Sequence, residues 1–144
     1  MAATAPAKRS QRASQQTVDA RRQATVAFEA ALGIARLWGL TDDQLSVLLG
    51  GIGRTTLQRW KAQLAAGGRI SAEFGPDTLD RVSYLLGIHK ALRILFMDTA
   101  QADGWVKRPN DGPGFGGRSA LDRMLDGRMD DLRYVRRYLD GWRG

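Results

Sequence analysis

The side chains best suited to chemistry in this chain are a group of cations and hydrogen-bond donors within one short segment. The group comprises Arg54, Thr55, Thr56, Gln58, Arg59 and Lys61. Leu57, Trp60 and Leu64 recur among them at helical spacing, so a helix here would keep its apolar side inward and the polar group largely outward. Guanidinium, amide and hydroxyl groups on an exposed helix face suit the reading of base edges in the major groove of DNA. The segment therefore predicts DNA contact.

A two-helix unit would position these side chains. Thr41 and Gln44 have the spacing of a capping box, in which each side chain bonds a backbone N–H that the first helical turn leaves unpaired. Residues 45–49 supply an apolar stripe, and Gly50-Gly51 allow the left-handed exit that ends a helix. A short helix, a tight turn and a second helix form the helix-turn-helix layout, whose second helix lies in the major groove. An ordinary helical hairpin within a bundle is the alternative interpretation.

Charge and composition favour a partner that is a polyanion. The chain has 144 residues, with 22 basic and 15 acidic side chains and a formal charge of +7. Residues 1–23 contribute +4 of this charge and residues 105–144 contribute +3. A basic excess attracts nucleic acid through counterion release, although solubility alone also accounts for such a charge. The N-terminus lacks the apolar core of a signal peptide, and no apolar run approaches a membrane span, so the expected location is the cytoplasm.

The pattern predicts an all-α fold in three parts. Residues 1–23 are expected to form a flexible basic arm, because the first 20 or so contain almost no large apolar side chains to repay the entropy of ordering. Residues 24–68 form a helix-turn-helix-like domain, whose first helix spans residues 24–38. Residues 69–144 form a second helical domain.

This second domain is expected to contain three helices. The first starts at Pro76 and runs to about residue 98, and Gly87 marks either a kink or a close helix contact. Residues 105–117 are rich in Gly, Pro, Asn and Asp, which indicates a loop. Ser119 can cap a short helix. The last helix spans residues 129–140 and stops at the glycine that follows.

The inventory of side chains argues against catalysis. The chain has no cysteine and one histidine, so it lacks a thiol nucleophile, a disulfide framework and any His/Cys metal-ligand spacing. Residues 112–117 match G-x-G-x-x-G, but a dinucleotide site needs a preceding strand, and none is predicted. The acidic pairs Asp42-Asp43 and Asp130-Asp131 fall in first helical turns, where the helix dipole accounts for them. We therefore expect no enzyme activity, no metal and no cofactor.

The C-terminal segments resemble a known family. Residues 105–110 read WVKRPN, residues 115–127 read FGGRSALDRMLDG, and residues 132–142 read LRYVRRYLDGW. This order is similar to the toxin-binding domain of the Xre/MbcA/ParS antitoxins: an aromatic before an Asn-containing loop, a helix start ending in A-L, an M-L-x-G stop, and a last helix ending V-x-x-Y-L-D. Residues 45–60, LSVLLGGIGRTTLQRW, resemble the helix-turn-helix unit that precedes that domain. The resemblance covers residues 24–144.

The resemblance implies a function and a set of contacts. Its partner would be a RES-type toxin, an enzyme that destroys cellular NAD, and the C-terminal domain would block access to the nucleotide pocket of that toxin. The antitoxin would also repress its own operon through the helix-turn-helix unit, and the C-terminal domain would support a homodimer. The DNA contacts would come from the group of residues 54–61 given above. The toxin contacts carried over to this sequence are Trp105, Arg108, Asn110, Phe115, Arg118, Arg136, Tyr138, Asp140, Gly141, Trp142 and Arg143.

The end of the sequence independently suggests an interface. Trp142 and Arg143 stand beside glycines, beyond the predicted last helical turn, and Trp and Arg dominate binding hot spots. The alternative is that Trp142 folds back as a plug of its own domain. Arg133, Arg136 and Arg137 lie on or near one face of the last helix, as either a solvated face or a contact for an acidic or phosphate-binding partner.

The sequence therefore predicts an antitoxin that blocks a RES-type toxin and binds its own promoter. A stand-alone helix-turn-helix transcriptional regulator without a toxin partner is the first alternative. It shares the hairpin and the basic arm, but it would not need the C-terminal helices with their aromatic and basic tail. The second alternative is an interaction module whose helix-turn-helix no longer binds DNA.

Overall fold

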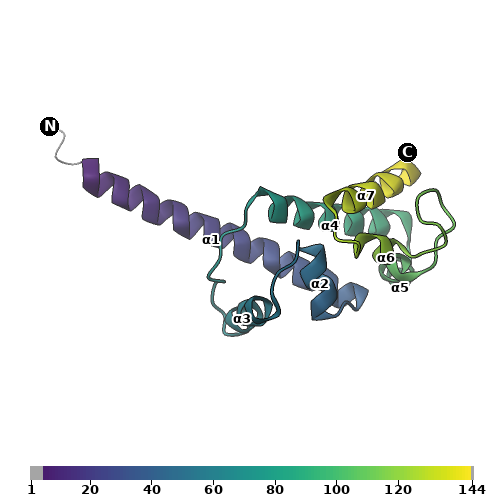
Figure 1. Ribbon diagram of the computed structural model, residues 1–144, viewed down its shortest axis with the longest axis horizontal. Helices are drawn as coiled ribbons and strands as arrows, with labels where there is room; N and C mark the ends of the chain where they lie inside the picture. The colour runs from purple at the N-terminus through teal and green to yellow at the C-terminus, as the bar shows by residue number, and fades with distance from the viewer. Residues whose placement is uncertain (1–4, 144) are drawn as a thin grey trace.

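The chain is helical throughout the part that the structure describes, residues 5–143 of a computed structural model. The predicted all-α class is confirmed, since these residues form seven α-helices and one short 3-10 helix and contain no strand. The molecule is elongated, with the start of α1 projecting at one end and α5, α6 and α7 gathered around α4 at the other (Figure 1). Within the described residues, no helix combines the length and apolar character that a membrane span requires.

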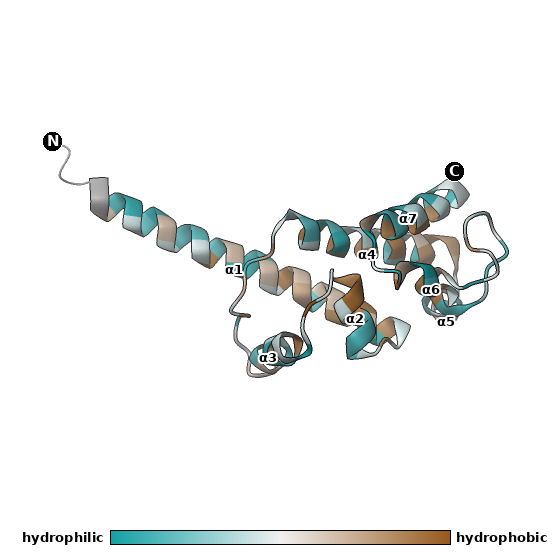
Figure 2. Ribbon diagram, viewed as in Figure 1, coloured by the Kyte–Doolittle hydropathy of each residue, from teal (hydrophilic) through white to brown (hydrophobic). Residues whose placement is uncertain are grey.

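Helix α1 (Ala5–Trp38) is much longer than the sequence predicts. Residues 5–23 continue the helix instead of forming the expected flexible arm, and residues 1–4 of that arm lie outside the described residues. The physical reason is composition: residues 5–23 contain no glycine and are rich in Ala, Gln and Arg, which are strong helix formers without any burial. At about 1.5 Å per residue α1 is about 50 Å long, and its hydrophilic first half projects beyond the rest of the molecule (Figure 2).

The predicted helix-turn-helix is present as α2 (Asp42–Leu48) and α3 (Arg54–Ala65). The capping box is confirmed: the Gln44 N–H donates to Thr41 Oγ1 over 3.1 Å, and the Thr41 N–H donates to Gln44 Oε1 over 2.9 Å. The chain leaves α2 through Gly50 and Gly51, whose φ angles of 102° and 92° lie in the left-handed region. The turn therefore depends on glycine at these positions.

The helix-turn-helix packs on the second half of α1 through an aromatic core. Trp60 of α3 meets Phe28 of α1 edge-on with ring centroids 5.3 Å apart, and Phe74 lies 5.4 Å from the same indole. The Ile70 N–H donates to Thr25 Oγ1 over 3.1 Å, which ties the segment after α3 to α1. The buried members of this first core are Ala24, Phe28, Ala31, Leu32, Ala35, Leu45, Leu49, Leu57, Trp60, Ile70 and Val82.

Helix α4 (Pro76–Leu95) connects the two ends of the molecule. Val82 belongs to the first core, whereas Leu85 and Leu92 belong to a second core formed with α5, α6 and α7. Helix α1 is shared in the same way, because its last turn carries Trp38 into the second core. The two parts of the chain therefore pack as neighbours on two common helices.

Gly87 marks a close contact, one of the two possibilities the sequence left open. Helix α4 runs through Gly87 without interruption, and the position is buried. A Cβ atom built on Gly87 would overlap the guanidinium of Arg136 from the last helix. The missing side chain thus makes room for an arginine that crosses α4.

The C-terminal part contains more helix than predicted. It comprises α5 (Thr99–Gly104), the 3-10 helix η1 (Trp105–Lys107), α6 (Ala120–Met124) and α7 (Met129–Arg143). Ser119 caps α6 as predicted, since its Oγ accepts from the Asp122 N–H over 3.0 Å. Helix α5 is absent from the sequence prediction. Asp98 caps its start, since the carboxylate accepts from the Ala100 N–H over 2.8 Å.

The predicted end of the last helix at residue 140 is wrong. Helix α7 continues through Gly141 to Arg143, so Trp142 lies on the helix and not beyond it. A single glycine costs a helix about 1 kcal/mol relative to alanine, and two local contacts offset this cost. Arg143 pairs with Asp140 at 3.6 Å, and the Trp142 ring lies 6.2 Å from that of Tyr138 one turn earlier.

Candidate functional site

The predicted DNA-contacting group lies on one helix, α3. Leu57 and Trp60 point into the first core, which leaves Thr55 and Arg59 exposed on the opposite side. Helix α3 has no acidic residue in its first turn, and Arg54 occupies the first position. This end of α3 therefore combines the positive pole of the helix dipole with a cation, an arrangement suited to anionic oxygens.

Three of the six side chains in this group bond to acidic side chains of α2. Arg54 pairs with Asp43 at 2.9 Å, Gln58 donates to Asp42 over 2.6 Å, and Lys61 donates to Asp42 over 3.0 Å. Hydrogen bonds from Lys61 first, and then from Gln58, hold the pKa of Asp42 below its ordinary value. The sequence explained these two acids by the helix dipole alone. Their contacts with α3 appear only in the tertiary structure, because 11 to 19 residues separate the partners.

The aromatic residues predicted to contact a toxin form one cluster between η1, the loop at residues 109–118 and α7. Phe115 is buried and lies at its centre, 4.9 Å from the Tyr138 ring and 6.4 Å from the Trp105 ring. Trp105 and Tyr138 stack with centroids 6.1 Å apart. Trp142 lies at the rim and is 68% exposed. The alternative in which Trp142 plugs the core is therefore wrong.

A cavity of about 300 Å³ opens beside this cluster. Its lining is almost entirely apolar and comprises Leu95, Phe96, Trp105, Tyr138, Leu139 and Trp142. Met97 follows directly in the chain and is fully exposed. The sequence did not place the end of α4 in the site. Only the crossing of α7 over α4 brings these residues together.

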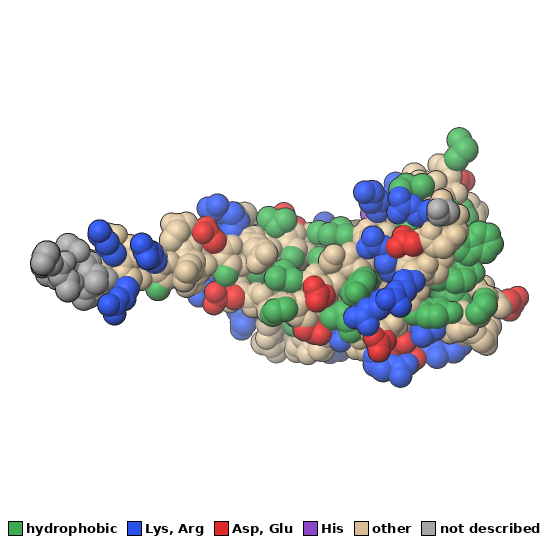
Figure 3. Space-filling view, turned by 90° about the horizontal axis from the view of Figure 1, so that it is seen from above, with side chains coloured by type: hydrophobic (Ala, Val, Ile, Leu, Met, Phe, Trp, Pro, Cys, Tyr) green, Lys and Arg blue, Asp and Glu red, His purple; other side chains and the backbone are tan. Residues whose placement is uncertain are grey.

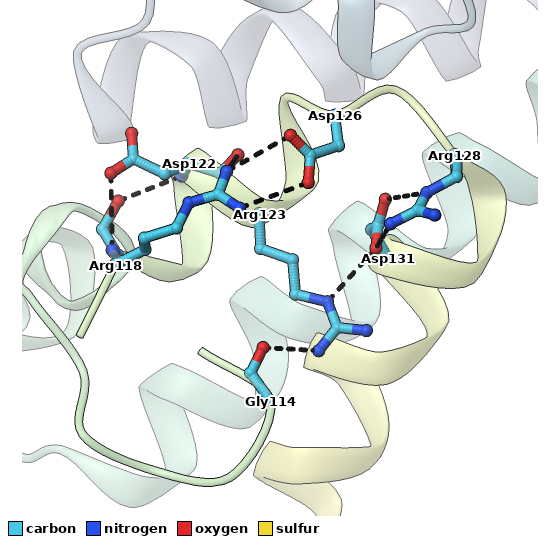
Figure 4. Close-up of polar contacts among 8 residues, drawn as sticks. Gly114, Arg118, Asp122, Arg123, Asp126, Arg128 and Asp131 are labelled. Atoms are coloured by element: carbon cyan, nitrogen blue, oxygen red, sulfur yellow. Dashed lines mark hydrogen bonds and ion pairs between the residues drawn. The ribbon is translucent and has the colours of Figure 1, made fainter. Parts of the chain in front are cut away.

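Polar members of the predicted set hold the loop and the end of α7 in place. Asn110 accepts from the Gly112 N–H over 2.7 Å, and its own N–H donates to the Arg118 carbonyl over 3.1 Å. Arg118 then pairs with Asp126 at 3.2 Å (Figure 4). Asp140 accepts from Arg136 Nε over 3.1 Å. These residues position the aromatic cluster.

Arg108 links η1 to the cavity. Its guanidinium donates to the Gln101 carbonyl over 3.0 Å and lies 5.9 Å from the centroid of the Phe96 ring. Gly141 and Arg143 are exposed on the last turn of α7. The predicted residues are thus brought together at one end of the molecule, with Phe115 as the buried support.

A buried carboxylate, which the sequence explained by the helix dipole alone, joins α6, α7 and the loop. Asp131 is 1% exposed and accepts from Arg123 over 3.2 Å and from Arg128 over 3.0 Å (Figure 4). Burial opposes its ionisation, but the two arginines outweigh burial and hold the pKa of Asp131 below its ordinary value. Arg123 also donates to the Gly114 carbonyl over 2.8 Å and lies 3.8 Å from the Tyr134 ring centroid.

Basic side chains gather in two places on the face shown in Figure 3, the projecting end of α1 and the C-terminal helices. Residues 7–143 contain no cluster of three or more His, Asp or Glu side chains that could hold a metal ion. The features available to a partner are therefore the polar face of α3, the basic side chains and the apolar cavity.

A helix-turn-helix unit followed by a small helical domain with an exposed aromatic cavity defines a two-part binding protein. Residues 17–87 match the antitoxin Xre-like helix-turn-helix domain, and residues 91–144 match the antitoxin Xre/MbcA/ParS C-terminal toxin-binding domain. The chain belongs to the Xre/MbcA/ParS family of antitoxins, and its partner is a toxin. It is also similar to the uncharacterized protein y4oB of Sinorhizobium fredii (strain NBRC 101917 / NGR234), with 49% identity over 117 residues that cover 81% of this chain and 84% of that protein.

Proposed function

We propose that this antitoxin neutralises a RES-type, NAD-degrading toxin by placing the end of α7 over the entrance of the toxin active site. The observation that carries the proposal is the exposed Trp142 beside an apolar cavity of about 300 Å³ within the matched toxin-binding domain. A large aromatic side chain with two thirds of its surface in water has area to bury against a partner. Trp is also among the residues that dominate interface energetics.

The surroundings of Trp142 support a preorganised contact. Tyr138 supports the indole from the previous turn, and the Arg136–Asp140–Arg143 series fixes the last turn through ion pairs at 3.1 and 3.6 Å. A side chain that is already held loses less conformational entropy on binding. The guanidinium of Arg143 suits an anionic group of the partner, such as a carboxylate or a phosphate site.

We propose further that α3 binds operator DNA and thereby represses the operon that encodes the antitoxin. The helix-turn-helix geometry, the outward Thr55 and Arg59, and the formal charge of +7 support this role. Thr55 and Arg59 make no hydrogen bond or ion pair with another side chain among residues 7–143, so they are available to base edges. The basic first half of α1 adds sequence-independent attraction to phosphates.

We propose that the antitoxin acts as a homodimer formed along α1 and α4. An open cleft between these helices is lined by apolar side chains that include Val26 and Leu86, which are 62% and 42% exposed. Residues 7–16 in the projecting half of α1 are exposed, so they are free to contact a second copy. Helix α1 of a second copy could therefore occupy the cleft between α1 and α4. Leu86→Asp should convert the dimer to a monomer in sedimentation velocity.

Co-expression with the product of the adjoining gene tests the toxin role. Growth and cellular NAD would be measured with the full-length antitoxin and with a form that ends at Leu139. Loss of NAD with the neighbour alone, recovery with the full-length chain and failure of the shortened form are the expected results. Recovery with both forms would exclude the end of α7 as the blocking element. A harmless neighbour would favour the stand-alone regulator instead.

A further inference from the structure

Two carboxylates of α2 occupy donors that α3 would otherwise offer to DNA. Asp43 pairs with Arg54 at 2.9 Å, and both oxygens of Asp42 lie within 3.2 Å of Lys61 Nζ. Gln58 adds a third bond, to Asp42 at 2.6 Å. The carboxylates present anionic oxygens to these donors, as the phosphates of DNA would.

We propose that Asp42 and Asp43 form an intramolecular screen that suppresses binding of α3 to DNA of unrelated sequence. The proposal rests on the DNA-binding role proposed above. Non-specific affinity comes almost entirely from cations that neutralise phosphates. Of the three cations on the polar face of α3, the screen holds Arg54 and Lys61 and leaves Arg59 outward.

The screen is weak enough to open. The side chains of Arg54 and Asp43 are 75% and 70% exposed, and ion pairs at such exposure contribute little to stability. Those of Lys61 and Asp42 are each 37% exposed, and the lowered pKa of Asp42 agrees with a contact that favours its charged form. Phosphates can therefore displace the carboxylates, but they gain less than they would from unpaired cations.

The consequence is discrimination between DNA sequences. A cognate duplex can add base-edge bonds to Thr55 and Arg59, which the screen does not touch. A duplex of unrelated sequence offers only phosphates, which must compete with Asp42 and Asp43. The screen thus lowers the affinity for DNA of both kinds, and the base-edge bonds let the cognate duplex alone keep enough affinity to bind.

The test measures binding to a random-sequence 24-base-pair duplex by fluorescence anisotropy across a salt series. The variants are Asp42→Asn, Asp43→Asn and both together, in the full chain. Asp111→Asn is the matched control, because it makes the same charge change at an exposed position in the distant loop. Circular dichroism melting verifies that each variant is folded.

The double variant is expected to bind the random duplex several-fold more tightly at low salt than the wild type. Each cation released to a phosphate should make the slope of log K against log salt steeper by about 0.9, so the double variant should gain between one and two. Asp111→Asn should leave both quantities close to the wild type. Lys61→Gln should weaken binding more in the Asp42→Asn background than in the wild type, since the screen already holds Lys61 in the latter.

The outcomes separate this inference from the DNA-binding role itself. If Asp111→Asn raised the affinity for the random duplex as much as Asp42→Asn or Asp43→Asn, net charge alone would explain the effect and the screen would be overturned. Unchanged or weaker binding by the double variant would also overturn it and make the carboxylates supports of α3. Binding by the double variant alone would sustain the screen and count against repression by the wild-type protein. If no variant binds the duplex at the lowest salt, both proposals fail.

Discussion

Replacing Trp142 with Ala should affect toxin binding more than folding stability, because most of this side chain is exposed and only a part is buried within the antitoxin. It is 68% exposed, so about a third of it is buried within the antitoxin. With about 250 Å² for the side chain and about 25 cal/mol per Å², the buried third accounts for at most about 2 kcal/mol of folding stability. The exposed remainder can contribute up to about 4 kcal/mol when a partner covers it.

These two figures give the expected measurements. Calorimetric titration against the purified toxin should show a loss of affinity between about 30-fold and 1,000-fold, which corresponds to 2–4 kcal/mol. The thermal unfolding midpoint should fall by no more than about 8 °C, at about 2–4 °C per kcal/mol for a chain of this size. Leu37→Ala is the matched control, because Leu37 is an exposed apolar residue of α1 and lies outside the toxin-binding domain at residues 91–144.

A loss of affinity below about five-fold would refute the reasoning, because a hot-spot side chain should cost at least about 2 kcal/mol. It would mean that Trp142 stays in water in the complex. A large loss of affinity that came with a collapse of the unfolding midpoint would be equally damaging, since the side chain would then support α7 and not the interface.

Four further outcomes follow from the structure. Asp131→Ala should lower the free energy of unfolding by about 2–3 kcal/mol in urea titrations, since it leaves the half-buried Arg123 without its carboxylate. Gly114→Ala should cost at least about 1–2 kcal/mol by the same assay, because its φ of 85° is left-handed. Burial, and then repulsion by Arg93, hold the pKa of His89 below the ordinary histidine value of 6.5. The unfolded state therefore binds the proton more readily, so thermal stability should be full above about pH 6.5 and fall below it, a slope that His89→Gln should remove. Arg59→Ala should weaken binding to the upstream region of the operon by about 1–3 kcal/mol if Arg59 reads a base, and an unchanged affinity in gel-shift titrations would exclude that contact.

Local signals predicted the helix-turn-helix and the caps. Thr41 and Gln44 form a capping box between residues three apart, so spacing alone identifies it, and Ser119 was equally recognisable as a cap. The sequence also predicted the start of α4 at Pro76. It did not predict how far α1 and α7 extend. In both cases the prediction gave too much weight to one rule, the absence of apolar side chains in the first and a terminal glycine in the second.

The sequence by itself determined the helical class, the order of the helices other than α5, and the candidate residues for both surfaces, because helix periodicity, caps and turn glycines act over a few residues. The tertiary structure decided what those residues do. It placed Asp42 and Asp43 against the polar face of α3, put Phe115 in the core, and left Trp142 at the rim of a cavity that the end of α4 completes. These outcomes depend on how α2 meets α3 and how α7 crosses α4. Such crossings are fixed by side chains far apart in the chain that fill a common core, and no local pattern encodes them.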